Sequence, residues 1–386
     1  MLDRLVSGRV KASKKSVLLL GARQVGKSTL TRALSPDVVI NLADEGRYLE
    51  YAKDPNRLRR ELMANKQARL ILLDEIQRVP ALLNTVQALM DEGLNARFIL
   101  TGSSARKLKR GGANLLPGRI VLEHLDPLTI WELGVLFDIE RCLHVGCLPG
   151  IYLDRESGQE VLESYAAVYL REEIQAEAVI HNIGAYARFL DAAALASGDW
   201  VNYSKLASDT EIPKETLRRY YQLLEDTLLA FRLQPYGKEA ANRRVPQRER
   251  ILLFDIGVRN ALLGISSGPL SETEKGKLFE HWFILQCAYF IRAHKLPWKI
   301  FFYRTDAGAE VDLIIDTGKH LLAIECKWSR TVRPTQLSGI RSFRAIATKP
   351  VRAFIVFRGE RAQLMEDILV LPFAEFLLQH LPELKQ

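Results

Sequence analysis

Cysteine is scarce in this sequence, and the few that occur lack metal-binding spacing. Cys142, Cys147, Cys287 and Cys326 form no C-x-x-C pair, which argues against a zinc site and against a disulfide framework. Long apolar runs are also lacking, since none approaches the roughly 20 residues of a membrane-spanning helix. The N-terminal segment MLDRLVSGRVKASKK has basic residues but no apolar core, unlike a secretory signal. These absences predict a reduced, cytoplasmic protein with no membrane partner.

Size and charge restrict the remaining possibilities. Of 386 residues, 48% are hydrophobic and 26% are charged, which is typical of globular proteins. A chain of this length predicts two or three domains with separate cores. The net charge of +8 favours a polyanionic partner such as nucleic acid, although mildly basic proteins without such a partner are also common.

A phosphate-binding loop is present in residues 17–29, VLLLGARQVGKST. Four of these residues fit G-x-x-x-x-G-K-[ST] without a mismatch, and the apolar run before them predicts the strand that this motif requires. In such a loop the backbone N–H groups surround an anion, and the following helix points its positive end at it. We expect Lys27 to reach the β- and γ-phosphates of ATP and Ser28 to bind Mg²⁺. The predicted nucleotide-binding residues are Gly21, Ala22, Arg23, Gln24, Val25, Gly26, Lys27, Ser28 and Thr29.

An acidic pair follows a buried strand downstream of this loop. Residues 38–42 predict a second strand, and the continuous apolar run 70–73 predicts a central parallel strand that ends in Asp74 and Glu75. Carboxylates at the carboxyl end of such a strand are the expected partners of a phosphate-binding loop. We therefore predict that Asp74 holds Mg²⁺ and that Glu75 is the general base that polarises the attacking water.

A further buried strand, 98–100, ends in hydroxyl side chains, and here the sequence resembles the AAA+ ATPases. The resemblance implies a sensor residue at this strand end, which maps onto Thr101 or Ser103. It also implies an arginine before the fifth strand that acts across a subunit boundary. Arg119 precedes the strand-like run 120–125 and fits this position, with Arg106 and Arg110 as nearby alternatives. Use of such an arginine implies that the active form is a homo-oligomer.

Residues 128–198 predict a helical lid, with helices near 128–138, 158–180 and 184–196. Glu172, Glu173 and Glu177 would give the middle helix an acidic face, and no catalytic pattern occurs in this region. Ahead of the lid, the basic segment 106–112 fits either a loop that follows a phosphate backbone or an ordinary solvated loop.

Residues 199–233 predict the element order of a winged helix. A helix at 203–208 capped by Asn202, a turn, a helix at 214–225 and a strand at 228–233 follow one another. The second helix would present Lys214, Thr216, Arg218 and Arg219 to a DNA groove. Winged helices also serve as protein contacts, so both partners remain open. The basic linker 242–250 would either extend this surface or be solvated.

The last third of the chain predicts a second group of charged residues. The apolar helix 276–293 carries Glu280, whose carboxylate needs a partner if it is buried. Strands at 310–315 and 320–327 are joined by a hairpin turn. Side-chain alternation brings Asp312, Glu325 and Lys327 to one face. Two carboxylates bind a divalent ion, and the lysine can orient water or stabilise a pentavalent phosphate.

Asp312 followed by Glu325-Cys326-Lys327 resembles the PD-(D/E)XK nuclease superfamily, although Val311 stands where its motif usually has proline. Glu280 would take the place of the upstream helical acid. The resemblance implies catalytic roles for Asp312, Glu325 and Lys327, with Mg²⁺ or Mn²⁺ held by Glu280, Asp312 and Glu325. A surface hairpin with ordinary charge alternation, or a nuclease fold without activity, remain alternatives.

From Leu18 to about Arg358, the chain resembles prokaryotic AAA+ ATPases that carry a C-terminal domain of unknown function with a restriction-endonuclease-like fold. The expected class is α/β. The expected domains are a P-loop AAA+ domain at 1–127, a helical lid at 128–198, a winged-helix-like segment and linker at 199–263, and a PD-(D/E)XK nuclease-like domain at 264–386.

The predicted function is ATP hydrolysis with Mg²⁺, coupled to action on DNA through the winged helix and the nuclease-like domain. The alternative is an ATP-controlled switch or assembly protein whose C-terminal domain binds DNA or protein without cutting. A protein remodeller is disfavoured because the sequence between the acidic strand and the sensor strand has no aromatic-glycine pore loop.

Overall fold

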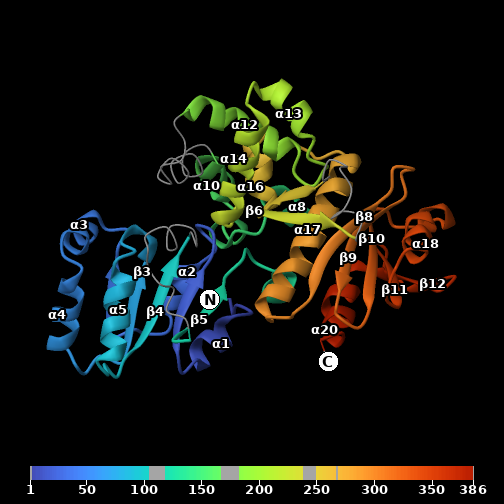
Figure 1. The fold of residues 1–386 in the computed structure, drawn as a ribbon. Coiled ribbons are helices and arrows are strands. Elements are labelled where there is room, and N and C mark those ends of the chain that lie inside the picture. The colour runs from blue at the N-terminus through green and yellow to red at the C-terminus, as the bar shows by residue number, and fades with distance from the viewer. Residues whose placement is uncertain (1, 104–117, 167–181, 238–248, 267, 386) are drawn as a thin grey trace. The chain divides into compact units, whose positions relative to one another are not determined.

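The structure is a computed structural model that describes residues 2–103, 118–166, 182–237, 249–266 and 268–385. The chain forms two compact units. Unit 1 contains Met1–Leu128 and Gln222–Leu229, and unit 2 contains Thr129–Tyr221 and Ala230–Gln386. In Figure 1 the strands of unit 1 run from blue to green-blue, and the larger sheet of unit 2 runs from yellow to red.

Unit 1 is built on a five-stranded sheet in the order β2-β3-β4-β1-β5. All neighbouring strands are parallel, so their carboxyl ends meet at one edge. The interior strands are apolar on both faces because helices cover the sheet on both sides. This confirms the predicted parallel α/β sheet. The strands are β1 (Ser16–Leu20), β2 (Val38–Asn41), β3 (Leu70–Asp74), β4 (Arg97–Gly102) and β5 (Ile120–His124).

Short helices connect the strands of unit 1 and enclose its core. Fully buried Tyr51, Leu58 and Val86 from three helices pack with Leu73 and Leu100 of the sheet. The helical segments are α1 (Ser7–Ala12), α2 (Lys27–Arg32), α3 (Glu45–Lys53), α4 (Asn56–Ala64), η1 (Ile76–Arg78) and α5 (Leu82–Asp91).

Unit 2 begins with helices, and the described part of the predicted lid is more broken than expected. Gly134, with φ of +50°, ends the first helix after one turn. The helix predicted at 158–180 is described only in its first part, and Glu172, Glu173 and Glu177 lie outside the described residues. The segments are α7 (Ile130–Leu133), η2 (Gly134–Leu136), α8 (Ile139–Val145), α9 (Pro149–Tyr152), α10 (Gly158–Ser164) and α12 (Ile183–Leu195).

The helix-turn-helix-strand order predicted for 199–233 is present as α13 (Tyr203–Thr210), α14 (Lys214–Asp226) and β6 (Ala230–Pro235). Asn202 caps α13 as predicted, since its side chain accepts hydrogen bonds from the backbone N–H groups of Ser204 and Lys205 at 3.1 Å. Rings from α12, α13 and α14 form an aromatic core with centroids 4.9 to 6.0 Å apart, made by Tyr186, Phe189, Tyr203, Tyr220 and Tyr221.

Strand β7 (Arg250–Leu253) pairs antiparallel with β6, and this hairpin is part of a larger sheet. Strand β6 also pairs in parallel with β8, which joins it to an eight-stranded sheet in the order β12-β13-β11-β10-β9-β8-β6-β7. The sheet therefore continues across the domain boundary predicted near residue 264. Its other strands are β8 (Lys299–Arg304), β9 (Glu310–Asp316), β10 (Leu321–Lys327), β11 (Val351–Phe357), β12 (Gln363–Met365) and β13 (Ile368–Pro372).

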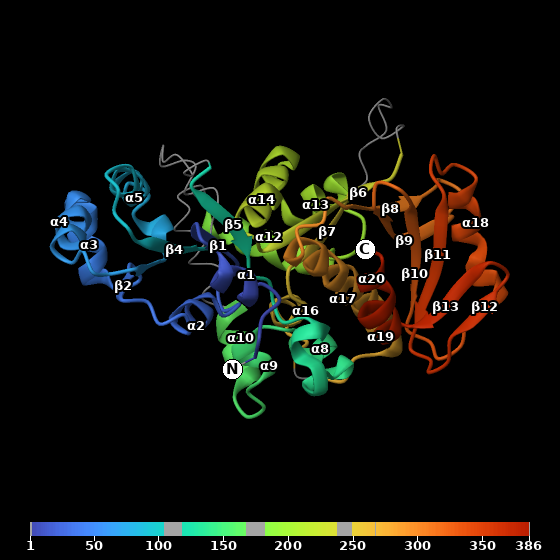
Figure 2. The same cartoon turned by 90° about the horizontal axis from the view of Figure 1, so that it is seen from below.

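Two helices cover opposite faces of this sheet, as Figures 1 and 2 show from two directions. Helix α17 (Glu272–Ala293) is buried from Leu278 onward apart from Glu280 and Arg292, as the apolar composition of this stretch predicts. Helix α18 (Ser338–Arg344) packs Ile340 and Phe343 against the other face. The remaining segments are α16 (Ile256–Leu262), η4 (Pro334–Leu337), α19 (Phe373–Glu375), the π-helical turn η5 (Phe376–His380) and α20 (Leu381–Glu383).

Helix α16 begins directly after Asp255. Asp255 is the N-cap of α16, because its side chain accepts hydrogen bonds from Val258 N at 3.1 Å and from Cys147 N at 2.6 Å. Aspartate is a preferred N-cap residue. The hydrogen bond from Cys147 N comes from a segment that is remote in sequence. All four cysteines are free and buried. Among the described helices, none combines the length and apolar character needed to cross a membrane.

Gly339 is expected to be essential for the packing of α18 on β9. A Cβ atom at this position would lie 1.8 Å from the backbone oxygen of Glu310. Gly339→Ala should therefore lower the free energy of unfolding by about 1–3 kcal/mol through overpacking. Gly276→Ala is the matched control, because that glycine is also helical and its nearest neighbour would be 3.9 Å away. The control should raise stability by about 0.5–1 kcal/mol. Equal effects in urea denaturation would contradict the expectation.

Candidate functional site

The phosphate-binding loop lies at the carboxyl edge of the unit 1 sheet, between β1 and α2. Gly26 has a φ of +96°, a left-handed conformation that favours glycine. Lys27 is buried, and its Nζ donates hydrogen bonds to the backbone oxygens of Gly21 and Ala22, each at 2.9 Å. The ammonium group is thereby fixed beside the loop that is predicted to bind phosphates.

Arg4, which the sequence did not single out, fixes this loop from outside the motif. Its Nη1 donates to the backbone oxygen of Val25 at 2.6 Å, and its Nη2 donates to that of Asp126 at 2.5 Å. Arg4 is buried, so these bonds replace lost hydration. They tie the loop to the chain just after β5. A single arginine in a basic N-terminal segment gives no spacing that would reveal this role.

The predicted magnesium and sensor residues form one hydrogen-bond network. Ser28 Oγ donates to Asp74 Oδ2 at 2.8 Å. Thr101 Oγ1 donates to the other oxygen of Asp74 and accepts a hydrogen bond from Glu75 N at 3.0 Å. Asp74 and Thr101 are both buried. The ends of β3 and β4 and the start of α2 therefore meet at one point, as parallel strand order requires.

Glu75 is held beside Lys27 by an unusual backbone conformation. Its φ of +59° and ψ of +44° are left-handed, which costs a non-glycine residue of order 1–3 kcal/mol and is frequent at functional sites. Its Oε1 lies 3.9 Å from Lys27 Nζ. Gln77 Nε2 donates to Glu75 Oε2 and to Ser103 Oγ, the latter at 3.0 Å. Gln77 thus links Glu75, the predicted base, to Ser103 directly after β4. The sequence did not reveal this role, because the contact depends on the left-handed turn at Glu75.

The predicted arginine finger lies away from this network. Arg119 precedes β5 and is therefore at the amino edge of the sheet, opposite the phosphate-binding loop. Its guanidinium pairs with Asp91 at the end of α5. Action on the nucleotide of another subunit stays a prediction. The whole basic segment 106–112, with Arg106 and Arg110, belongs to 104–117, outside the described residues.

The oxygen-only donor set of Ser28 and Asp74 suits a hard cation such as Mg²⁺. One oxygen of Asp74 faces the Ser28 hydroxyl and the other is fixed by Thr101. These residues therefore fit the cation that the motif implies.

A second charged group lies in unit 2. We call Glu280, Glu310, Asp312 and Glu325 the acidic cluster. Strands β9 and β10 are antiparallel with Leu313 opposite Ile324, and Cys326 N donates to Asp312 Oδ2 at 2.8 Å. Lys327 Nζ donates to Glu325 Oε1 at 2.6 Å. The predicted Asp312, Glu325 and Lys327 are thus brought together.

Burial and mutual repulsion shift the pKa values in the acidic cluster. Burial raises the pKa of Asp312 well above its ordinary value, and the charges of Glu280 and Glu325 raise it further. Burial raises the pKa of Glu325 to about 7, with Lys327 opposing the shift. Burial also raises the pKa of Glu310. Burial alone would lower the pKa of Lys327, but the carboxylates of Glu325 and Asp312 raise it.

Glu280 has a partner that the sequence analysis missed. Arg250 of β7 donates to Glu280 Oε1 through Nη2 and to the backbone oxygen of Gly198 through Nε at 2.8 Å. The prediction named Glu280 as a metal ligand, whereas here it forms an ion pair. Within the described ranges, no set of three or more histidine, cysteine, aspartate or glutamate side chains is arranged to hold a metal ion. Asp312 and Glu325 alone still offer oxygen ligands that suit Mg²⁺ or Mn²⁺.

Comparison with known proteins identifies the first region and leaves the others unassigned. Residues 13–134 match the family described as an AAA domain. Residues 136–268 and 275–376 match two families described as domains of unknown function, numbers 8612 and 4143. With the parallel sheet, the first match makes this region an AAA-type domain, which implies nucleotide binding. The nuclease-like assignment of the last region remains a prediction.

Individual relatives add little on function. Uncharacterized proteins of Mycobacterium bovis and Mycobacterium tuberculosis are each 27% identical over 368 residues, covering 94% of this chain and 80% of theirs. The solved structure of AMPPCP-bound DnaA from Aquifex aeolicus is 14% identical, with a TM-score of 0.26, covering 57% of this chain and 86% of that one. A likeness at this TM-score carries no conclusion.

Gln77 is expected to position Glu75 for ATP hydrolysis. Gln77→Ala removes the amide that joins Glu75 to Ser103, so kcat should fall about tenfold while the affinity for ATP changes less than about twofold. Gln87→Ala on α5 is the matched control and should leave both unchanged. Steady-state hydrolysis and binding of a fluorescent ATP analogue measure the two quantities. A loss of affinity equal to the loss of kcat would contradict the positioning role.

Proposed function

We propose that this protein binds and hydrolyses ATP as an AAA+ protein, and that it acts on DNA through its winged-helix-like segment and a metal-dependent nuclease-like domain. The observation that carries the first part is the network joining Ser28, Asp74, Glu75 and Thr101. The second part is supported by the exposed cations of α14 and by the acidic cluster with Lys327.

In the proposed ATPase, each residue of the network has one task. The loop N–H groups bind the phosphates, and Lys27 neutralises charge on the β- and γ-oxygens. Ser28 and Asp74 would hold Mg²⁺, which would supply positive charge to offset the charge of the phosphates. Glu75 orients water and accepts its proton. Thr101 fixes both Asp74 and the backbone of Glu75, so the strand end that carries the acids is set before ATP binds.

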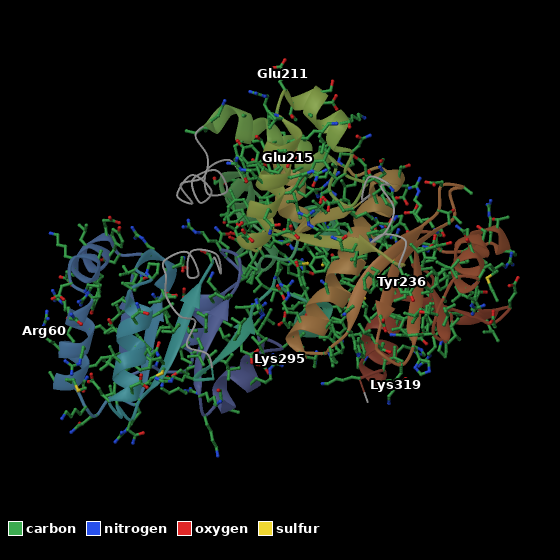
Figure 3. The ribbon with its side chains drawn as sticks, in the orientation of Figure 1. Arg60, Glu211, Glu215, Tyr236, Lys295 and Lys319 are labelled. Atoms are coloured by element: carbon green, nitrogen blue, oxygen red, sulfur yellow. The ribbon has the colours of Figure 1, made fainter. Side chains whose placement is uncertain are left out.

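The proposed DNA contact is the outer side of α14. Lys214, Arg218 and Arg219 are exposed on this helix, and Thr216 is half-buried. The guanidinium of Arg218 lies 5.0 Å from the ring centroid of Tyr203, which fixes its stem. Glu211 and Glu215, labelled in Figure 3, belong to the same exposed turn. Glu215 Oε1 lies 4.0 Å from Arg218 Nε, so DNA phosphates would compete with this acid for the arginine.

The proposed cleavage centre is the pair of strands β9 and β10. Asp312 and Glu325 would hold a divalent ion, which supplies Lewis-acid polarisation of the phosphodiester. Lys327, whose pKa is raised by Glu325 and Asp312 despite its burial, stays protonated and donates to a developing phosphorane oxygen. Cys326 N holds one oxygen of Asp312 in place.

A second candidate function is an ATP-controlled switch whose C-terminal domain binds DNA or protein without cutting. One contact favours it. Glu280, which was predicted to bind a metal ion, is already paired with Arg250 of the same chain.

DNA binding through α14 predicts a defined change in salt dependence. Replacing both Arg218 and Arg219 by alanine removes two phosphate contacts, so the slope of log K against log salt should become shallower by about 2. Arg60→Ala is the control, because Arg60 is an exposed arginine on α4, paired with Asp54 and labelled in Figure 3. Fluorescence anisotropy with duplex DNA measures the slope. Identical slopes in both variants and wild type would assign α14 to another partner.

Cleavage by the acidic cluster is tested on linear, single-stranded and branched DNA with Mg²⁺ or Mn²⁺, with and without ATP. Lys327→Ala and Asp312→Asn should each reduce cleavage at least 100-fold, as loss of a catalytic group does, while ATP hydrolysis stays intact. Lys319→Ala in the exposed β9–β10 turn is the control (Figure 3). If no DNA is cut while DNA still accelerates ATP hydrolysis, the switch replaces the nuclease.

A further inference from the structure

Arg250 is one of the most buried cations among the described residues. It is 4% exposed and lies at the start of β7, where it bridges to Trp200. Its guanidinium carbon is 6.0 Å from the ring centroid of Phe302, which is itself fully buried. Aromatic walls therefore exclude water from one side of this charge, so its partners must come from the protein.

Those partners connect three segments of unit 2. Nε donates to the backbone oxygen of Gly198, and Nη2 pairs with Glu280 on α17. The carboxylates of Asp312 and Glu310 are close enough to act on the pKa of Arg250, which is raised despite the opposing effect of burial. Arg250 thus lies beside the acidic cluster and contacts Glu280, its member on helix α17.

One carboxylate oxygen of the acidic cluster is left unsatisfied. Glu325 is 9% exposed, and its Oε2 is buried without a hydrogen-bond partner in the part of the chain described. Its other oxygen is held by Lys327. An unsatisfied carboxylate oxygen beside Asp312 is costly in a protein interior, and a cation bound there would satisfy it.

We propose that Arg250 is a built-in counter-ion that withholds Glu280 from a divalent cation site formed with Asp312 and Glu325, so that removing its charge opens a tighter site. The inference rests on the metal-dependent role proposed above for the acidic cluster. The guanidinium acts in two ways. It pairs with Glu280 Oε1 and so competes with a metal ion for that carboxylate, and its positive charge repels a second cation from Asp312.

The test measures binding of Mn²⁺ alone by isothermal titration calorimetry, on the full chain without nucleotide. All proteins carry Asp74→Asn, which silences the site in unit 1. Arg250→Gln should bind Mn²⁺ at least tenfold more tightly than the parent, because Glu280 becomes available. Arg304→Gln is the matched control, since Arg304 pairs with Glu310 at 3.2 Å but is partly exposed. It should change the affinity less than threefold.

A double variant makes the result independent of how well the single variant folds. Arg250→Gln with Glu280→Gln removes both charges of the pair, and we expect its Mn²⁺ affinity to stay within threefold of the parent because Glu280 is not a ligand there. A tenfold loss in the double variant, or unchanged affinity in the single variant, would overturn the role of Arg250. Absence of Mn²⁺ binding in every protein would overturn the proposed metal site itself. Cleavage assays then show separately whether the proposed nuclease function stands.

Discussion

Removing a charged side chain from water costs several kcal/mol unless partners offset the loss, and both charged sites of this protein are arranged around that cost. In unit 1 the buried Asp74 is satisfied by two hydroxyl groups. In unit 2 the buried Asp255 accepts two backbone hydrogen bonds, yet burial still raises its pKa to about 6. The acidic cluster goes further, since it gathers four carboxylates whose cationic partners include Arg250, Arg304 and Lys327. Both oxygens of Asp74 have hydrogen-bond partners, whereas Glu325 Oε2 is buried without one in the described part of the chain.

The fold of unit 1 was largely predictable because its signals are local. Apolar runs mark β1, β3 and β4, which are buried on both faces, and the glycines and lysine of one motif mark the turn into α2. The C-terminal hairpin β9–β10 was also predicted from alternation and its turn. The eight-stranded sheet was not, because its order depends on long-range pairings. Joining β6 to β8 requires Gln234 to meet Phe301, and no local pattern encodes such a contact.

The difference between local signals and long-range contacts also applies to the candidate sites. Ser28, Asp74 and Thr101 follow from strand ends of a parallel sheet, so the sequence predicts that they meet. Gln77 and Arg250 escaped prediction because each acts through a contact made by tertiary folding. The first depends on a left-handed turn at Glu75, and the second on packing of β7 against α17. For Glu280, the sequence predicted that the carboxylate needs a partner and suggested a metal ion, since it gives no means of choosing between that and a remote arginine.

The continuity of the β6–β7 hairpin with the large sheet has a mechanical consequence. Backbone pairing joins β7, β6, β8, β9 and β10 in one sheet, with one register shift between β8 and β9 at Phe301 to Tyr303. A sheet is stiff along its hydrogen-bonding direction, so the strand that follows α14 and the strand that carries Glu325 cannot change their spacing independently. Any movement of β6 is therefore transmitted through β8 and β9 to β10, the strand that carries Glu325 and Lys327.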